Sequence, residues 1–253
     1  MNPVCFHIGP KPIYWYGVMV ALAFLATVTH WNALARRDHR PVGFGSEIAF
    51  WIMLSGILGA RIAYILANLD YYLASPAEII RLDRGGLIYY GGFIGATLAL
   101  IVFARRHKEP VLSLADFCVT GLPLGHAIGR IGCFLNGCCY GLPTTSFLGI
   151  HYPANSDACL RYGDVAVLPV QLFESAINLV LYAVLLYAYP RRKKHGSVLA
   201  LYLLTYPIAR FLLEFLRGDE RLHWIGLNAA QVVSVVLFAS GVGLWAVLRK
   251  KTE

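Results

Sequence analysis

Residues 112–135 read LSLADFCVTGLPLGHAIGRIGCFL, an apolar stretch interrupted by Asp116, His126 and Arg130. An α-helix crosses the bilayer core with about 20 apolar residues, so the length of this stretch predicts a transmembrane helix. Ionisable groups inside such a helix are costly in lipid and usually serve a function. The stretch therefore predicts both the class of fold and the part of the chain that carries the function.

Six further apolar stretches are long enough, or nearly so, to cross a membrane. They cover residues 13–34, 44–69, 87–104, 171–189, 198–215 and 229–247. Hydrophobic residues make up 58% of the chain and charged residues 14%, which leaves more apolar surface than one soluble core can bury. We expect an all-α membrane protein of about seven transmembrane helices. Because the basic flank follows the first stretch, we expect that stretch to be retained as a helix rather than cleaved as a signal peptide.

Basic residues gather in four connections between these stretches. Residues 36–40, 105–108, 191–194 and 249–251 hold 13 of the 22 lysines and arginines. If seven helices alternate in direction, all four clusters lie on one side of the membrane, which the positive-inside rule makes cytoplasmic. The sequence thus predicts an external N-terminus and a cytoplasmic C-terminus. The same distribution favours a membrane protein over a nucleic-acid-binding protein, although the net charge is +8.

The connections predict one membrane domain with small external additions. No internal repeat, low-complexity tract or long linker divides residues 1–253, so we expect a single polytopic domain. Residues 70–86 contain Ser75 and Pro76, a pair typical of the start of a short helix. Residues 141–168 are polar and rich in turn-forming residues, which predicts an external loop or small cap.

Three arginines, Arg61, Arg130 and Arg210, lie in or near apolar stretches. A buried guanidinium is costly unless a carboxylate or phosphate accepts its hydrogen bonds. Arg210 and Glu214 are four residues apart and can pair on one helix face. Arg130 has no acidic residue within four positions, so it is the better candidate for binding a substrate anion. The acidic residues available as internal partners are Asp116, Glu174 and Glu214.

Glycines near the end of the opening stretch predict an interrupted helix. Gly129, Gly132, Gly137 and Gly141 flank Asn136. Small residues allow close helix packing in lipid, which explains part of this density. The glycines that packing does not explain predict a break in the helix, which would expose backbone N–H and C=O groups to a ligand.

Residues 129–141, GRIGCFLNGCCYG, resemble the signature of the prolipoprotein diacylglyceryl transferase family, a G-R-x-G-N-F-x-N-G frame followed by a glutamate and a closing glycine. Four further motifs occur in the family's order. WYG at 15–17 resembles its H-W-Y-G, GLIYYGG at 86–92 its G-G-x-x-F-H-G-G, PVQLFE at 169–174 its P-S-Q-L-Y-E, and RFLLEF at 210–215 its R-x-x-x-E-F. The resemblance extends along nearly the whole chain.

The resemblance implies an enzyme that transfers diacylglycerol from phosphatidylglycerol to a cysteine thiol of a lipoprotein precursor bearing a signal peptide. Glycerol phosphate is the expected second product. The implied location is the bacterial cytoplasmic (inner) membrane, with multiple passes. The implied partners are phosphatidylglycerol, the precursor and membrane lipid, without nucleic acid, cofactor or metal.

The matching residues take the family's roles by resemblance. Arg130 and Arg210 would handle the phosphate, while Tyr16 and Asn136 would position the headgroup. Such a reaction needs positive charge at the departing phosphate and a base that forms the attacking thiolate. The residues expected to support this pocket are Gln171 and Glu174.

The family's histidine in G-G-x-x-F-H-G-G is proposed to be catalytic, and Tyr90 stands at its position here. A free phenol has a pKa of about 10 and is a poor base for a thiol unless nearby arginines lower that pKa. His126 offers an alternative base, because it lies four residues before Arg130 and shares its face on a helix. The catalytic candidates are therefore Arg130, Arg210, Tyr90 and His126.

Cysteines replace two polar residues of the signature. Cys133 stands where the family has asparagine and Cys138 where it has glutamate, and Cys139 follows directly. The C-x4-C-C pattern is not a recognised zinc spacing, so we expect no metal. Redox pairing or a covalent thiol intermediate are alternatives, and a lipid pocket lined by small, soft side chains is favoured. On the expected external face, Cys5 and Cys159 could form a disulfide, although sequence does not determine pairing.

Two other functions share these features. An enzyme of the same fold could transfer the same lipid group to a different acceptor, since Tyr90, Cys133 and Cys138 depart from the family pattern. A lipid or anion transporter would also contain buried arginines and broken helices, but the chain shows no repeated half.

Overall fold

The computed structural model describes residues 3–81, 85–154, 156–219, 223–224 and 226–250. Most of these residues are helical, and the chain divides into two compact units. The first unit contains Met1–Thr27 and Asp116–Glu253, and the second contains Val28–Ala115. Helix α1 (Trp15–Arg37) begins in the first unit and ends in the second.

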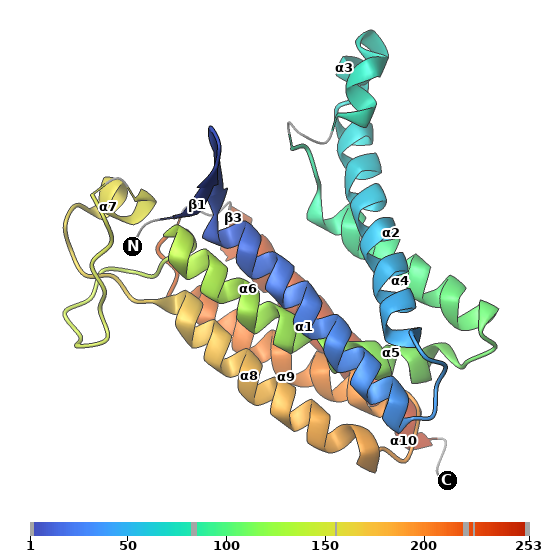
Figure 1. The fold of residues 1–253 in the computed structure, drawn as a ribbon. Helices are drawn as coiled ribbons and strands as arrows, with labels where there is room; N and C mark the ends of the chain where they lie inside the picture. The colour runs from blue at the N-terminus through green and yellow to red at the C-terminus, as the bar shows by residue number, and fades with distance from the viewer. Residues whose placement is uncertain (1–2, 82–84, 155, 220–222, 225, 251–253) are drawn as a thin grey trace. The chain divides into compact units, whose positions relative to one another are not determined.

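The first unit is a helical bundle. Helices α6, α8, α9 and α10 pack in chain order, each against the next (Figure 1). Their bounds are Leu122–Asn136, Val170–Ala188, Ser197–Glu214 and Ala229–Lys250. The N-terminal part of α1 lies close to α6, because a Cβ atom at Gly132 would approach Met19 to 2.9 Å. Gly132 therefore serves close helix packing.

The second unit is built on helices α2 (Phe44–Ala67) and α4 (Tyr89–Arg106), which pack along one another. Glycines line their contact, and a side chain at Gly59, Gly91 or Gly95 would collide with the backbone or with Ala63 of the facing helix. These glycines permit a close helix crossing of the kind common in membrane proteins. Two short helices follow α2, namely α3 (Leu69–Ala74) and the 3₁₀ helix η1 (Pro76–Ile80). The expected helix start at Ser75 and Pro76 is found, although the Ser75 side chain does not cap it.

The expected membrane-spanning helices correspond closely to the observed ones. Six helical segments have the length and hydropathy of a membrane span: Trp15–Arg37, Phe44–Ala67, Val111–Asn136, Val170–Arg191, Ser197–Glu214 and Ala229–Lys250. Helix α4 occupies the remaining expected stretch at 87–104. The all-α membrane class is thereby confirmed.

The opening stretch is interrupted at two places. Helix α5 (Val111–Val119) ends before Gly121, and α6 then continues through Gly129 and Gly132. The break predicted within residues 129–141 is found at the end of this segment's helical part, after Asn136. The helix ends at Asn136, where Gly137 adopts a left-handed φ of 75° that few other residues accept.

Residues 141–168 form a small packed cap rather than an open loop. Helix α7 (Asp157–Tyr162) lies within it, and the buried residues Tyr140, Tyr152, Ala158 and Val167 form its core. Figure 1 shows α7 and its connections beside one end of α6 and α8. Two short hairpins complete the chain's secondary structure, β1 (Val4–Ile8) with β2 (Lys11–Tyr14) and β3 (His223–Trp224) with β4 (Leu227–Asn228).

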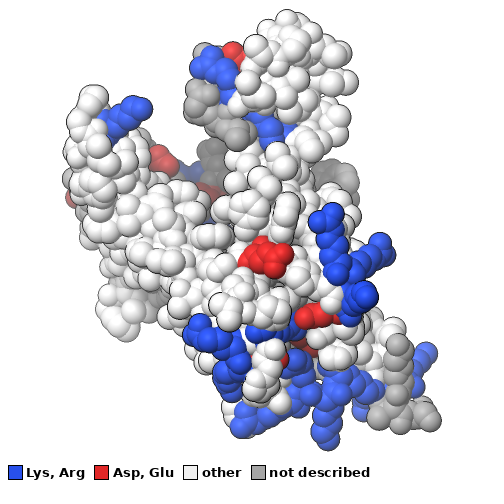
Figure 2. All heavy atoms as spheres, turned by 45° about the vertical axis from the view of Figure 1, so that its right-hand side comes forward, with Lys and Arg blue, Asp and Glu red and all other residues white. Residues whose placement is uncertain are grey.

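Charged side chains lie mainly at the ends of the helices. On the face drawn in Figure 2, uncharged residues cover the middle of the helices and basic residues gather at their termini. In the first unit, Lys194 donates to the carbonyl of Leu248, so the basic ends of α8 and α10 meet. In the second unit, Arg40 pairs with Glu109 at 3.1 Å, which joins the connections after α1 and α4. The two basic clusters of each unit thus lie near one another, and the orientation in the membrane stays a prediction.

Candidate active site

The centre of the first unit holds an ion-pair network around Glu174 of α8. Its Oε1 lies 3.0 Å from Nη2 of Arg130 and 3.2 Å from Nε2 of His126, both on α6. Nε of Arg130 also donates to Nε2 of His126 at 3.2 Å, which confirms that these two residues share a helix face. Arg130 has no acidic residue within four positions, and its carboxylate partner Glu174, one of the available internal partners, comes from another helix.

Helix α9 adds the second arginine to the network. Nε of Arg210 lies 3.9 Å from Oε1 of Glu174, and its Nη1 forms a close ion pair with Glu214 one turn later. The pairing of Arg210 with Glu214 that their spacing predicts is therefore observed. Glu174 faces both Arg130 and Arg210, so one buried carboxylate joins the two arginines that the sequence assigned to phosphate handling.

Arg217 extends this network in a way that the sequence interpretation missed. It follows α9 and forms a bidentate pair with Asp219, with both N···O distances at 2.8 Å. Its side chain is almost fully buried, and the Asp219 carboxylate raises the pKa of the guanidinium despite this burial. The nearby aspartate was a signal for pairing, but nothing in the sequence indicated that Arg217 approaches the 129–141 segment.

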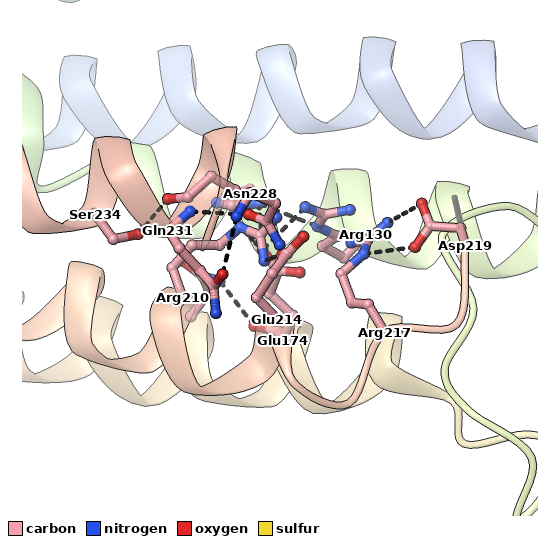
Figure 3. A network of polar contacts seen from close by, with 12 residues as sticks. Arg130, Glu174, Arg210, Glu214, Arg217, Asp219, Asn228, Gln231 and Ser234 are labelled. Atoms are coloured by element: carbon pink, nitrogen blue, oxygen red, sulfur yellow. Dashed lines mark hydrogen bonds and ion pairs between the residues drawn. The ribbon is translucent and has the colours of Figure 1, made fainter. Parts of the chain in front are cut away.

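Figure 3 shows the polar side chains in a continuous row between the helices, from Ser234 at one end to Asp219 at the other. The middle of the row holds Arg130, Glu174, Arg210 and Glu214. Strand β4 contributes the buried Asn228 to the row, and helix α10 contributes the buried Gln231 and Ser234. Buried arginines and carboxylates in such a row form a preorganised electrostatic site within an apolar bundle.

Gln171 fixes the segment that follows α6. Its Nε2 donates to the carbonyl of Cys138 at 2.7 Å and it exchanges hydrogen bonds with the hydroxyl of Tyr152. Burial raises the pKa of Tyr152 to about 12, so the phenol stays neutral and can both donate and accept. The supporting position that the sequence suggested for Gln171 thus has a geometric basis, namely the attachment of the Cys138 segment to α8.

All six cysteines are free thiols, including Cys5 and Cys159. The disulfide considered for that pair is therefore not formed. Cys118 is 4% exposed and behaves as a small buried residue. Cys133, Cys138 and Cys139 come together instead, with their Sγ atoms within 4.8 Å of one another.

Comparison with known proteins connects this geometry to a family. The model of the family described as prolipoprotein diacylglyceryl transferase matches residues 3–247. The chain belongs to this family. It is 35% identical over 255 residues to phosphatidylglycerol–prolipoprotein diacylglyceryl transferase 2 of Clostridium perfringens, covering 99% of this chain and 97% of the relative. It is 35% identical over 247 residues to the corresponding transferase of Synechococcus elongatus, covering 95% and 85%, and 30% identical over 257 residues to that of Clostridium tetani, covering 100% of both.

The two headgroup residues carried over from the diacylglyceryl transferase family lie near each other. Tyr16 and Asn136 line one surface pocket together with residues of the β1–β2 hairpin and Gly17. Both side chains are exposed, which makes them accessible to a ligand. The pocket joins the start of α1 to the end of α6, where the family signature ends.

Tyr90, which replaces the histidine of the diacylglyceryl transferase motif, belongs to the second unit. It lies in the first turn of α4, is 49% exposed, and contacts the ring of Tyr89 edge to face at 5.7 Å. His126 is instead built into the charged network of the first unit. Of the two candidate bases, His126 is therefore the one held by contacts to Arg130 and Glu174.

Proposed function

We propose that this chain transfers the diacylglyceryl group of phosphatidylglycerol to the cysteine thiol of a prolipoprotein. In the reaction the thiol sulfur forms a C–S bond to the glyceryl carbon while the C–O bond to the phosphate breaks. The products are a thioether-linked lipoprotein and glycerol phosphate. The observation that carries the proposal is the convergence of Arg130 and Arg210 on Glu174 inside the bundle of a member of this transferase family.

The arginines stabilise the charge that develops on the departing phosphate. A guanidinium has five N–H donors, and the contacts of Arg130 to His126 and Glu174 leave donors for phosphate oxygens. Arg210 lies near the same oxygen, Oε1 of Glu174, and can share the anion. Because the guanidiniums are held in place before the lipid arrives, they stabilise the transition state with little reorganisation.

His126 is the base that we assign to the attacking thiol. A neutral imidazole accepts a proton from the thiol, and the resulting imidazolium lies 3.2 Å from Oε1 of Glu174. A phosphate that binds Arg130 would draw its donor away from Nε2 of His126, which frees that nitrogen for the proton. Glu174 then orients and stabilises the protonated ring, as a carboxylate does in other histidine-based sites. Tyr90 is the alternative base by family position.

The bacterial inner membrane is the location that we assign to this multi-pass protein, with the N-terminus external and the C-terminus cytoplasmic. The four basic clusters support that orientation. In this arrangement the cap at 141–168 and the pocket lined by Tyr16 and Asn136 lie on the external side. A secreted precursor that carries a signal peptide would present its cysteine there.

The purified chain in phosphatidylglycerol vesicles tests the function directly. We expect incubation with a peptide that carries a lipoprotein-type cysteine to yield a diacylglyceryl peptide by mass spectrometry and an equal amount of glycerol phosphate. The matched acceptor has serine in place of that cysteine and should yield neither product. Arg130→Ala should lose both products while retaining the helical content of the original chain.

Two outcomes would redirect the proposal. Glycerol phosphate release with an acceptor other than the cysteine peptide would indicate a transferase of the same fold with different specificity. Absence of glycerol phosphate with every acceptor, together with movement of lipid or anion across the vesicle, would indicate a transporter.

A further inference from the structure

The three thiols at the end of α6 form a cluster that the transferase chemistry does not require. Cys133 lies in the last turn of α6, and Cys138 and Cys139 follow Gly137, the glycine that ends the helix. Their Sγ atoms all lie within 4.8 Å of one another. With metal–sulfur bonds of about 2.3 Å, three thiolates around one ion lie roughly 4 Å apart, so small side-chain movements suffice to enclose an ion.

The backbone is held in the shape that brings the thiols together. Cys139 adopts a φ of 64°, a left-handed conformation that a residue with a side chain rarely takes. The N–H of Cys138 donates to the carbonyl of Cys133 at 3.2 Å, and Gln171 binds the Cys138 carbonyl at 2.7 Å. The turn is thus fixed from α6 and from α8, and the cluster is not the product of an unrestrained loop.

Positive charge lies beside the sulfurs. The Arg217 guanidinium is within hydrogen-bond reach of the Cys139 thiol. Arg130 also interacts electrostatically with Cys133 and Cys139. Two guanidiniums therefore offset negative charge that collects on the sulfurs. All three cysteines are only partly buried, so an ion from solution can reach them.

The number of ligands distinguishes between metals. Zinc in a structural site takes four ligands, whereas the group of potential ligands that the described residues bring together here contains three. Thiolates are soft ligands that suit copper(I), zinc and iron–sulfur clusters, so the number of sulfur ligands decides among them. Copper(I), a monovalent ion that can bind three sulfur ligands, fits the three thiols. The C-x4-C-C spacing is not a zinc pattern, and it is compatible with copper(I).

We propose that Cys133, Cys138 and Cys139 bind one copper(I) ion through three thiolate sulfurs. Binding forms three copper–sulfur bonds and releases the protons of the thiols to solvent, with no change in oxidation state. The ion would lie beside Arg130, next to the active-site network.

The experiment is a titration of the reduced, full-length protein in detergent with copper(I) buffered by a chelator of known affinity. We expect one ion per chain, a thiolate-to-copper charge-transfer band, and an X-ray absorption spectrum with sulfur alone in the first coordination shell. Cys133→Ser, Cys138→Ser and Cys139→Ser should each weaken binding by more than about tenfold, since even the loss of an indirect partner has effects of this size. Cys159→Ser removes a thiol of the cap at 141–168, outside the cluster, and should bind copper(I) unchanged.

A second measurement avoids reliance on the variants. Copper(I) should protect these three cysteines of the original chain from alkylation, as located by mass spectrometry of the peptides. Equal binding by the chain and by the triple serine variant would overturn the proposal. So would a disulfide between two of the three cysteines in the purified protein, or tighter binding of zinc than of copper(I) with a fourth ligand.

Discussion

Two buried arginine sites, one in each unit, satisfy the guanidinium in different ways. Arg61 of α2 is 7% exposed and uses all five of its N–H donors on backbone carbonyls. The acceptors are the carbonyls of Glu78, Ile79, Arg81, Gly85 and Gly86. Arg130 of α6 is comparably buried but has side-chain partners, His126 and Glu174.

The difference teaches how to separate a structural arginine from a reactive one. The donors of Arg61 are saturated by main-chain groups that cannot move without unfolding the segment that follows α2, so this residue fixes a loop. The partners of Arg130 are side chains that can rotate, and the arginine keeps donors for an incoming phosphate. Burial alone does not distinguish the two residues, whereas the identity of their acceptors does.

The largest effect is expected from Arg130→Lys. A lysine keeps the charge but loses the planar fork, so contacts to Glu174, His126 and phosphate cannot be made together. We expect turnover to fall by about a thousandfold, the upper range for losing one preorganised donor group. The measurement is diacylglyceryl-peptide formation at saturating phosphatidylglycerol, with thermal unfolding as the control for folding. Turnover within tenfold of the original chain would contradict a role for the fork.

His126→Gln should have the next largest effect. Glutamine can keep polar contacts with Arg130 and Glu174 but cannot take up the proton of the thiol. We expect turnover to fall by about a hundredfold, in the range for loss of a general base. The measurement is diacylglyceryl-peptide formation at saturating phosphatidylglycerol. Turnover within tenfold of the original chain would leave Tyr90 as the base.

Arg61→Lys is expected to have the smallest effect on turnover and a clear effect on stability. The variant leaves several buried carbonyls without hydrogen-bond donors. We expect this to lower the free energy of unfolding by about 3 kcal/mol. For a chain of this size that corresponds to a Tm lower by roughly 5–10 °C. Turnover of the folded fraction should stay within about twofold. A turnover loss as large as that of Arg130→Lys would contradict a purely structural role for Arg61.

The fold was largely predictable because helix length and hydropathy are local properties. The bilayer requires about 20 apolar residues per helix, and each expected stretch contains an observed helix. The helix break was predictable as a region, because α6 ends at Asn136 inside the glycine-rich segment 129–141. The role of each glycine was not predictable. Gly132 remains helical, and the approach of Met19 shows that it serves close helix packing.

The site was predictable where a short spacing determines the contact. Arg130 with His126, and Arg210 with Glu214, lie four residues apart, and one helical turn brings each pair together. The pairing of Arg130 with Glu174 and the approach of Arg217 were not predictable, because they join different helices. The three cysteines were noted as a group, but their convergence was not predictable, since Cys139 adopts a positive φ angle in the turn that brings them together.

The sequence by itself determined the membrane class, the positions of the helices, the family and the arginines that can meet an anion. These follow from composition, from local spacing and from ordered motifs, none of which requires knowledge of how the helices pack. Only the tertiary structure decided which partners the arginines have. Glu174 joins Arg130 and Arg210, carbonyls saturate Arg61, and three thiols meet at the end of α6. Such contacts depend on the packing of one helix against another, which brings together residues that are distant in the chain.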